Sequence, residues 1–232
     1  SNGFTDSEER LLTVAENTLS RASYLGDASE DDAFTGAEYL PDGTLVLSAI
    51  LDPALFPGVV PQYLNGAVAG DRGLIVRLSE NGQSVLSVSV VGPRVLDVST
   101  DPSGRIHAAA DTSGVVVLNS SADSVLFSQA FPKRAHRIDA GSDGTFAVLT
   151  ANTSDYASSQ TANATAYAYS PGYSLLGEMG GASFFTTDLA VDSATQTIAF
   201  IGWRNISSME DDTGSNRSEE RRVGKECTLR CR

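Results

Sequence analysis

Residues 74–88, Leu74-Ile-Val-Arg-Leu-Ser-Glu-Asn-Gly-Gln-Ser-Val-Leu-Ser-Val88, decide the fold class of this chain. Apolar side chains alternate on both sides of Asn81-Gly82, a pair that strongly favours a β-hairpin because both central residues of its turn have positive φ. Residues 115–127 and 164–177 repeat the order of alternating strand, polar turn and alternating strand. One type of hairpin therefore recurs along the chain.

A second type of hairpin lies between the copies of the first. It runs from Asp97 through a turn near Gly104 into an apolar strand. Residues 139–149, 188–201 and 36–49 repeat this order, the last of them with Gly in the place of the first Asp. The strict alternation of two hairpin types predicts repeated units of four antiparallel strands.

The opening residues fit two structures. Residues 6–19 form an amphipathic pattern with Asp6 or Ser7 as an N-cap, which is typical of a helix. Residues 12–26 also match the hairpin at 74–92, sharing an apolar-Glu-Asn turn and a final strand that ends in Gly. We favour the hairpin because it continues the repeat.

Units of four antiparallel strands in succession are typical of β-propeller blades, each of which buries both faces against its neighbours. A β-sandwich is the competing all-β architecture, but it does not explain two alternating hairpins with matching Asp and Gly positions. We predict an all-β, propeller-like body at residues 1–216, with about three to four blades that form an incomplete arc of a larger propeller. Blade boundaries are expected near residues 26, 92, 131 and 181, and residues 51–72, rich in Pro and Gly, are expected on one rim.

The charge balance excludes some partners. The chain has a formal net charge of −13, whereas nucleic acids and anionic membrane surfaces attract clustered Lys and Arg. The sequence contains no run of about 18 apolar residues, which is what a transmembrane helix requires, so membrane insertion is not expected. Through residue 216 the chain has a single lysine, Lys133, and more Asp than Glu, a composition that suits an extracellular setting.

Residues 217–232 differ in composition from the rest. Both cysteines, Cys227 and Cys231, lie there, and basic side chains outnumber acidic ones. Two thiols without a nearby His do not complete a zinc site. The string at 217–227 resembles the conceptual translation of a sequencing-library adapter, so we expect a disordered tail of artefactual origin and a natural protein that continues past Asn216.

Four short motifs connect the unit to a known repeat: Tyr24-Leu-Gly26, Asp31-Asp-Ala33, Asp42-Gly43-Thr-Leu-Val46 and Arg77-Leu-Ser-Glu-Asn-Gly82. Their order, an apolar strand ending in Gly, an Asp-Asp-Ala stretch and a turn Gly before an aliphatic strand, resembles the short bacterial β-propeller repeats (SBBP type). Gly180-Gly181 keeps the Gly pair of that family, and His107 stands where the family often has Tyr. The resemblance implies a secreted scaffold or interaction role and brings no catalytic residues.

Three aspartates, Asp97, Asp139 and Asp188, occupy one position of the repeat as it aligns in sequence. Equivalent residues of successive blades form a ring, so these carboxylates could line the axis and bind a cation or a basic ligand. The alternative, which we favour, is that each accepts backbone N–H groups at a strand entry or an inter-blade turn. A second set is assigned to the tight turns: Asp42, Asp101, Asp143 and Asp192.

The remaining candidates are few. The acidic stretch 27–32 offers oxygen ligands for calcium but lacks the spacing of a calcium loop, so we favour a solvated loop without a cofactor and keep calcium binding as the alternative. His107 alternates within a strand, which indicates a position in the core or between blades. The basic cluster at 133–137, which includes His136, either holds an anionic ligand or is a solvated edge. No catalytic residue is assigned, because the sequence has no Gly-x-Ser-x-Gly, phosphate-loop or His-Glu-x-x-His motif.

Two functions from different classes follow. The first is a non-enzymatic scaffold or interaction module of a secreted or cell-surface protein, which binds protein or carbohydrate through rim loops. The second is a fragment of a propeller enzyme (a lyase, glycosidase or quinone-dependent dehydrogenase) with its site at the central channel; a rigid spacer is a third possibility. They are distinguished by whether a set of five charged side chains converges at one mouth: Asp97, Asp139, Asp188, Arg94 and Arg137.

Overall fold

The computed structural model describes residues 32–56, 58–152, 164–180, 184–195 and 197–204, and the backbone of three further strands. Those strands are β1 (Leu12–Val14), β2 (Asn17–Leu19) and β18 (Cys227–Arg230). Within these residues the chain is all-β, apart from one 3₁₀ turn, η1 (Pro53–Leu55). The predicted fold class is therefore confirmed.

The first blade is a five-stranded sheet in the order β3-β4-β6-β7-β5. Its strands are β3 (Ala33–Tyr39), β4 (Leu45–Ile50), β6 (Gly73–Leu78), β7 (Val85–Gly92) and β5 (Gln62–Tyr63). The insertion at 51–72 was expected as a loop only. Instead it supplies η1 and β5, which pairs parallel to β7 with Gln62 opposite Ser89, because the outermost strand of a blade leaves its outer backbone groups available.

The second and third blades are four-stranded antiparallel meanders. The strands of the second are β8 (Asp97–Thr100), β9 (Ile106–Ala109), β10 (Val115–Leu118) and β11 (Val125–Gln129). Those of the third are β12 (Arg134–Ala140), β13 (Phe146–Ala151), β14 (Thr165–Tyr169) and β15 (Leu175–Gly180). In both, strands pair in sequence order, as expected for hairpins joined by short turns.

The fourth sheet contains β16 (Phe184–Asp192) and β17 (Thr197–Arg204), with β18 on the other side of β17. Residues 227–230 thus form a strand where no regular structure was expected. An unpaired edge such as that of β17 favours the addition of any extended segment, and the Cys-Thr-Leu-Arg sequence of β18 alternates apolar and polar residues. At the other end, β1 and β2 form an antiparallel hairpin, as predicted in preference to a helix.

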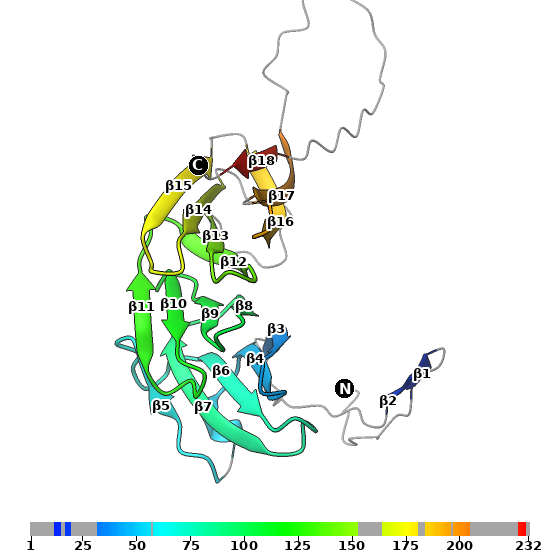
Figure 1. Ribbon diagram of the computed structural model, residues 1–232. Coiled ribbons are helices and arrows are strands. Elements are labelled where there is room, and N and C mark those ends of the chain that lie inside the picture. The colour runs from blue at the N-terminus through cyan, green and yellow to red at the C-terminus, as the bar shows by residue number, and fades with distance from the viewer. Residues whose placement is uncertain are drawn as a thin grey trace, which may run out of the picture.

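The four sheets follow one another around an arc (Figure 1). Strands β3, β8, β12 and β16 lie along its inner border, and β11, β15 and the pair of β7 with β5 lie along its outer border. Side-by-side packing of β3 with β8, β8 with β12 and β12 with β16 joins consecutive sheets at the inner border. This is the arrangement of propeller blades.

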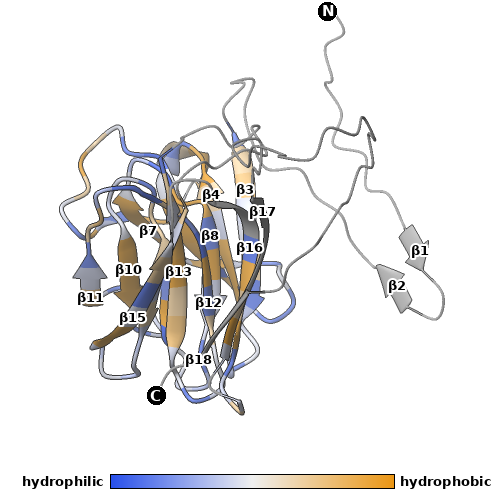
Figure 2. Cartoon of the chain, turned by 90° about the horizontal axis from the view of Figure 1, so that it is seen from above, coloured by the Kyte–Doolittle hydropathy of each residue, from blue (hydrophilic) through white to orange (hydrophobic). Residues whose placement is uncertain are grey.

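The core lies between the blades. The central strands are the most apolar, and hydrophilic residues gather in the turns (Figure 2). Strands β9, β10 and β13 are buried along their whole length, since neighbouring blades cover both of their faces. The apolar cluster between the first two blades is aliphatic, whereas the cluster between the second and third contains Phe146 and Tyr169 at its centre.

Candidate functional site

The three ring aspartates lie on the inner strands of the arc: Asp97 on β8, Asp139 on β12 and Asp188 on β16. The hairpin turns that follow the inner strands of the first three blades give a common reference, because Gly43, Gly104 and Gly144 all have positive φ. In each turn the glycine N–H bonds to the carbonyl three residues earlier. The inner strands can therefore be aligned residue by residue.

This alignment corrects the predicted ring. Asp97 lies seven residues before its turn glycine, whereas Asp139 lies only five before its own. Gly36 and Arg137 therefore share the position of Asp97. Asp188 belongs to the same position, because it directly follows a β-bulge, as Gly36 and Arg137 do. Asp139 instead shares its position with Glu38 and Ser99, which is two residues further along the inner strand and so on the same face.

The misalignment came from the turn aspartates. Asp143 directly precedes its turn glycine, as Asp42 does, but Asp101 lies three residues before Gly104. Matching Asp101 to Asp143 shifted the second blade by two residues, which is the side-chain period of a strand and so left the apolar pattern unchanged. Asp101 nevertheless makes the predicted turn contacts, because its Oδ1 accepts the N–H groups of Ser103 at 2.9 Å and Arg105 at 3.1 Å.

Asp97 connects its blade to both neighbouring blades. Its Oδ2 accepts the backbone N–H of Ile138 in the third blade at 3.0 Å, and its Oδ1 accepts the N–H of Val98 at 3.0 Å. Towards the first blade the carboxylate lies against Gly36, where a Cβ would approach Oδ1 to 3.1 Å and Ser48 Oγ to 2.9 Å. The absence of a side chain at Gly36 gives this carboxylate its space.

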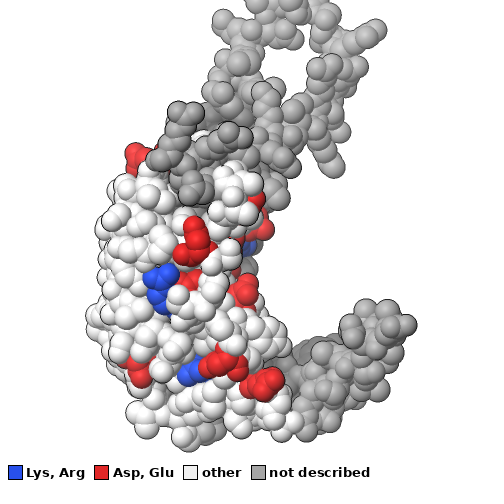
Figure 3. Space-filling view, in the orientation of Figure 1, with Lys and Arg blue, Asp and Glu red and all other residues white. Residues whose placement is uncertain are grey.

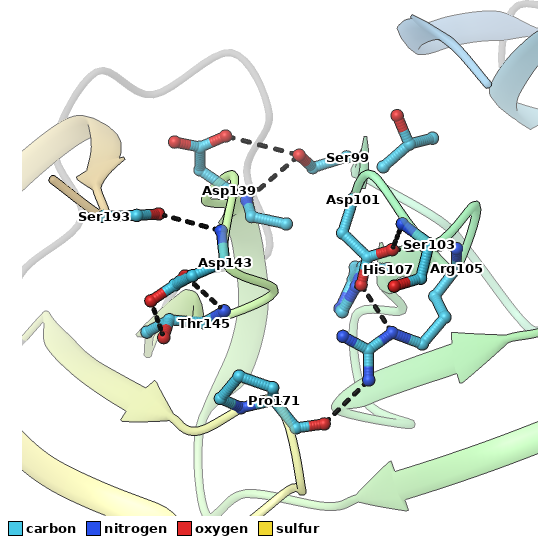
Figure 4. A network of polar contacts seen from close by, with 12 residues as sticks. Ser99, Asp101, Ser103, Arg105, His107, Asp139, Asp143, Thr145, Pro171 and Ser193 are labelled. Atoms are coloured by element: carbon cyan, nitrogen blue, oxygen red, sulfur yellow. Dashed lines mark hydrogen bonds and ion pairs between the residues drawn. The ribbon is translucent and has the colours of Figure 1, made fainter. Parts of the chain in front are cut away.

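Asp139 makes a similar connection one blade further along, at the position that Ser99 occupies in the second blade. Its Oδ2 accepts the N–H of Val191 in the fourth blade at 2.6 Å. Its Oδ1 accepts the hydroxyl of Ser99 at 3.3 Å, as Figure 4 shows. Ser99 Oγ in turn accepts the N–H of Ala140 at 3.1 Å. Backbone N–H groups of the next blade thus occupy an oxygen of both Asp97 and Asp139.

The charges along the inner border influence one another. Burial raises the pKa of Asp97 to about 6; the N–H of Ile138 and the charge of Arg137 partly oppose this, and the charge of Asp188 adds to it. Burial also raises the pKa of Asp139, again with a contribution from Asp188. The pKa of Glu38 is raised by burial and then by Asp139. Repulsion between these carboxylates indicates that they lie on one face.

Part of the set used to distinguish the two functions does come together. Asp97, Asp139, Asp188 and Arg137 interact along the inner border, and acidic side chains outnumber basic ones on the side of the molecule seen in Figure 3. Arg137 Nη1 donates to the carbonyls of His136 at 3.1 Å and Leu96 at 3.4 Å. No contact among the described residues joins Arg94 to this group, nor do three His, Cys, Asp or Glu side chains gather there as metal ligands.

A buried polar cluster that the sequence did not reveal lies between the second and third blades (Figure 4). Asp101, 2 % exposed, accepts Arg105 Nε at 2.5 Å and His107 Nε2 at 3.2 Å on its Oδ2. Arg105 Nη1 donates to the carbonyl of Pro171 at 2.7 Å, and its guanidinium lies 5.6 Å from the centre of the Tyr173 ring. The spacing of Asp101 and Arg105 across one turn was the available signal.

Burial favours the neutral form of His107, against the hydrogen bond and the charge of Asp101, which favour the protonated form. Burial lowers the pKa of His107, and its ring packs 4.7 Å from that of Phe146, as expected for a histidine between blades. Because Asp101 faces Nε2, we assign the proton to that nitrogen; Nδ1 is buried and has no hydrogen-bond partner among the described residues. Burial alone would raise the pKa of Asp101, but hydrogen bonds from His107 and Arg105 lower it to about 2. The cluster therefore keeps the carboxylate of Asp101 ionised at the junction between the second and third blades.

The other turn aspartates behave as predicted. Asp42 and Asp143 accept the N–H of the threonine two residues later, at 2.9 Å and 2.8 Å, and Asp192 accepts the N–H of Ala194 at 3.0 Å. Hydrogen bonds from Thr44 and Thr195 lower the pKa values of Asp42 and Asp192, respectively. These side chains stabilise hairpin turns.

The insertion at 51–72 presents apolar side chains on a well-fixed backbone. Asp52 Oδ1 caps η1 by accepting the N–H of Ala54 at 2.8 Å, and the N–H of Leu64 bonds to the carbonyl of Val90 at 2.9 Å. The side chains of Val60, Tyr63 and Val68 are nevertheless 86 %, 47 % and 63 % exposed. This is the one predicted rim segment in which large apolar side chains of the described residues are concentrated in solvent.

Two further predicted sites are the acidic stretch 27–32 and the basic cluster 133–137. Residues 27–31 of the acidic stretch lie outside the described residues, and Asp32 forms an ion pair with Arg72. In the basic cluster, Lys133 donates to Thr165 Oγ1 at 2.8 Å and Arg134 pairs with Asp111 at 3.2 Å. The cluster therefore joins strands of the protein to one another. Across the described part of the chain, no helix has the length and apolar character needed to span a membrane.

Comparisons with known proteins identify the fold but no family. No family model and no curated protein matches the chain. Among solved structures it is similar to hydrazine synthase of Kuenenia stuttgartiensis, with a TM-score of 0.53 and 10 % identity over 89 % of this chain and 65 % of that one. The computationally designed Ika8 protein gives a TM-score of 0.50 and 14 % identity over 74 % of this chain and 43 % of that one.

A protein of unknown function from Bacteroides caccae, with 14 % identity over 81 % of this chain and 61 % of that chain, has a TM-score of 0.48. The chain thus spans less than two thirds of each of these structures. At such low identity the first two likenesses bear on the fold alone. Together with the geometry above, they place this chain among all-β proteins with propeller-like blades.

Proposed function

We propose that this chain is a non-enzymatic, propeller-like scaffold of a secreted or cell-surface protein, and that it binds a protein or carbohydrate partner through the rim insertion of its first blade. The observation that carries the proposal is the exposure of Val60, Tyr63 and Val68 on a fixed backbone. A partly exposed tyrosine with aliphatic neighbours is a frequent anchor of binding surfaces, and a fixed loop loses little entropy on binding.

The use of the inner carboxylates also supports a scaffold. Asp97 and Asp139 each accept a backbone N–H of the next blade on one carboxylate oxygen, at 3.0 Å and 2.6 Å, so their main contacts are structural. An enzyme of the alternative class needs polar side chains at the channel that are directed at a substrate. The SBBP-like motifs and the scarcity of lysine are the grounds for a secreted or surface location.

The test is a binding screen of the purified chain on arrays of glycans and of purified extracellular proteins. A triple variant, Val60→Ser with Tyr63→Ser and Val68→Ser, is expected to weaken any saturable binding at least about tenfold. Leu176→Ser, which removes an exposed leucine of β15, is the matched control and should bind like the parent. Binding that survives the triple variant but is lost in Arg137→Met would contradict the proposal and favour a site at the inner border.

A further inference from the structure

The last antiparallel strands of three consecutive blades begin alike. Each of β7, β11 and β15 starts directly after a serine. The first two residues of each strand are aliphatic and exposed or half-buried, in the segments Ser84-Val-Leu86, Ser124-Val-Leu126 and Ser174-Leu-Leu176. The three leucines are 48 %, 46 % and 47 % exposed. In every case the leucine is the extra residue of a β-bulge, because its two neighbours pair with consecutive residues of the preceding strand, so the positions are equivalent.

These equivalent edges differ in how they are protected from pairing with other chains. The outer side of β7 is partly covered by β5, which pairs at Ser89 and Val90. Strand β15 includes a charged residue, Glu178, and two glycines. Charges and short covering segments are common devices that keep sheet edges from associating. Two of the three edges therefore have such a device.

Strand β11 has neither device. Residues 124–132, Ser-Val-Leu-Phe-Ser-Gln-Ala-Phe-Pro, contain no charge, and within the described residues β11 pairs with β10 alone. A window of this composition, with strand-favouring residues and no charge before its final proline, is prone to intermolecular strand pairing. The strand is also held firmly, since the Phe127 ring stacks on Tyr173 with centroids 4.9 Å apart.

We propose that the outer edge of β11 pairs antiparallel with β11 of a second copy of this chain, so that the two second blades join into one continuous sheet. Such pairing is self-complementary and closes a two-fold dimer, in which each copy uses the same residues. It would cover the exposed side chains of Val125 and Leu126 in both copies.

The absence of charge on this edge favours it as the contact between two copies of the chain. With a net charge of −13, two copies repel each other over most of their surface, and the uncharged segment 124–132 is a place where they can approach. The segment lies between residues of opposite sign, Asp123 before it and Lys133 after it. Antiparallel pairing turns the acidic end of one copy towards the basic end of the other.

The experiment measures the mass of the full chain by light scattering and sedimentation at about 1–200 μM, together with amide hydrogen exchange. The parent is expected to form a dimer, and protection of the β11 amides is expected to rise with concentration. Leu126→Lys places a charge on the edge and should raise the dimer dissociation constant at least about tenfold. Leu176→Lys, the equivalent change on β15, is the matched control and should dimerise like the parent.

Three results would overturn the inference. A parent chain that stays monomeric over the whole range excludes pairing between copies. A dimer that Leu176→Lys dissociates as strongly as Leu126→Lys does not form specifically through β11. A dimer whose β11 amides exchange at the same rate as in the dilute monomer uses another surface, and this measurement needs no variant that might fail to fold.

Discussion

The junction between the first and second blades and the junction between the second and third are held together by different chemistry. At the first, hydroxyl groups donate to backbone carbonyls across the interface, from Thr35 to Val95 and from Thr100 to Tyr39, at 2.8 Å and 2.9 Å. At the second, carboxylate and hydroxyl oxygens accept backbone N–H groups. Arg105 of the second blade also donates to the carbonyl of Pro171 in the third, and Arg134 of the third blade donates to Asp111 in the second.

The packing differs in the same way. The first junction encloses an aliphatic cluster, whereas the second encloses stacked rings, with Phe146 and Tyr169 5.0 Å apart and Phe127 5.6 Å from Tyr169. A repeat can thus keep its backbone geometry while its junctions acquire different dependences on pH and on side-chain volume.

Phe146→Ala should be the most damaging change at the aromatic junction. It removes a fully buried ring that contacts His107, Phe127 and Tyr169, so we expect a loss of about 3–5 kcal/mol in the free energy of unfolding. Chemical denaturation measures the loss. Ile106→Val, at the aliphatic junction, is the control and should cost about 1 kcal/mol. Equal losses would show that the two junctions do not differ in this respect.

Asp101→Asn should cost about 2–3 kcal/mol, because it leaves Arg105 and His107 without their charged partner in a buried setting. Asp42→Asn removes a turn carboxylate that is exposed to solvent, and its cost should stay below about 1 kcal/mol. Thermal and denaturant unfolding of both variants gives the comparison. A smaller loss for Asp101→Asn than for Asp42→Asn would argue against a structural role for the buried cluster.

Lowering the pH from 7 towards 4 should stabilise the second junction. The pKa of Asp97 is about 6 in the folded chain and 3.8 in the unfolded one, so the folded state holds an extra proton between these values. Stability therefore rises as the pH falls through 6 and levels off near 4, with a gain of about 2 kcal/mol. Asp97→Asn should be more stable than the parent at pH 7 and should lose most of this gain. A variant with the parent's pH profile would contradict the assignment.

Thr35→Val should have the smallest effect, and one that does not depend on pH. It removes hydroxyl bonds to Val95 and Ser48 at the first junction, at a cost of about 1 kcal/mol at pH 5 and pH 7 alike. Denaturation at the two pH values checks this, with Asp97→Asn measured in parallel. A cost that changes with pH would mean that the carboxylates also act at the first junction.

The sequence predicted the strand pattern well, because hairpin turns and alternation are local signals. Asn81-Gly82 and the turn glycines at 43, 104 and 144 mark their hairpins by a positive φ that needs no tertiary context. The alignment of the inner strands from one blade to the next has no such local signal. The two-residue misplacement of Asp139 kept every apolar side chain on its own face, so only the bulges and hydrogen bonds of the folded chain distinguished the alternatives.

The candidate sites were predictable to a lesser degree. The N–H groups that occupy Asp97 and Asp139 come from Ile138 and Val191, which are distant in sequence and have no polar side chain to signal the contact. The strand β5 was missed because a two-residue parallel pairing leaves no periodic pattern. The contacts of Asp101 with Arg105 and His107 lie within the second blade, and the spacing of Asp101 and Arg105 was a signal for them. The bond from Arg105 to Pro171 comes from the third blade and was not visible in that sequence.

The contact between Asp97 and Gly36 has a geometric consequence. One carboxylate lies against the backbone of the preceding blade and holds the N–H of the following one, so its reach sets the separation of three inner strands. Because the blades diverge from that border, a small change there alters the wedge angle between them, and the per-unit rotation fixes the curvature of the whole series. The small residue at position 36 and the short acid at position 97 are thus spacers that determine the radius of the arc.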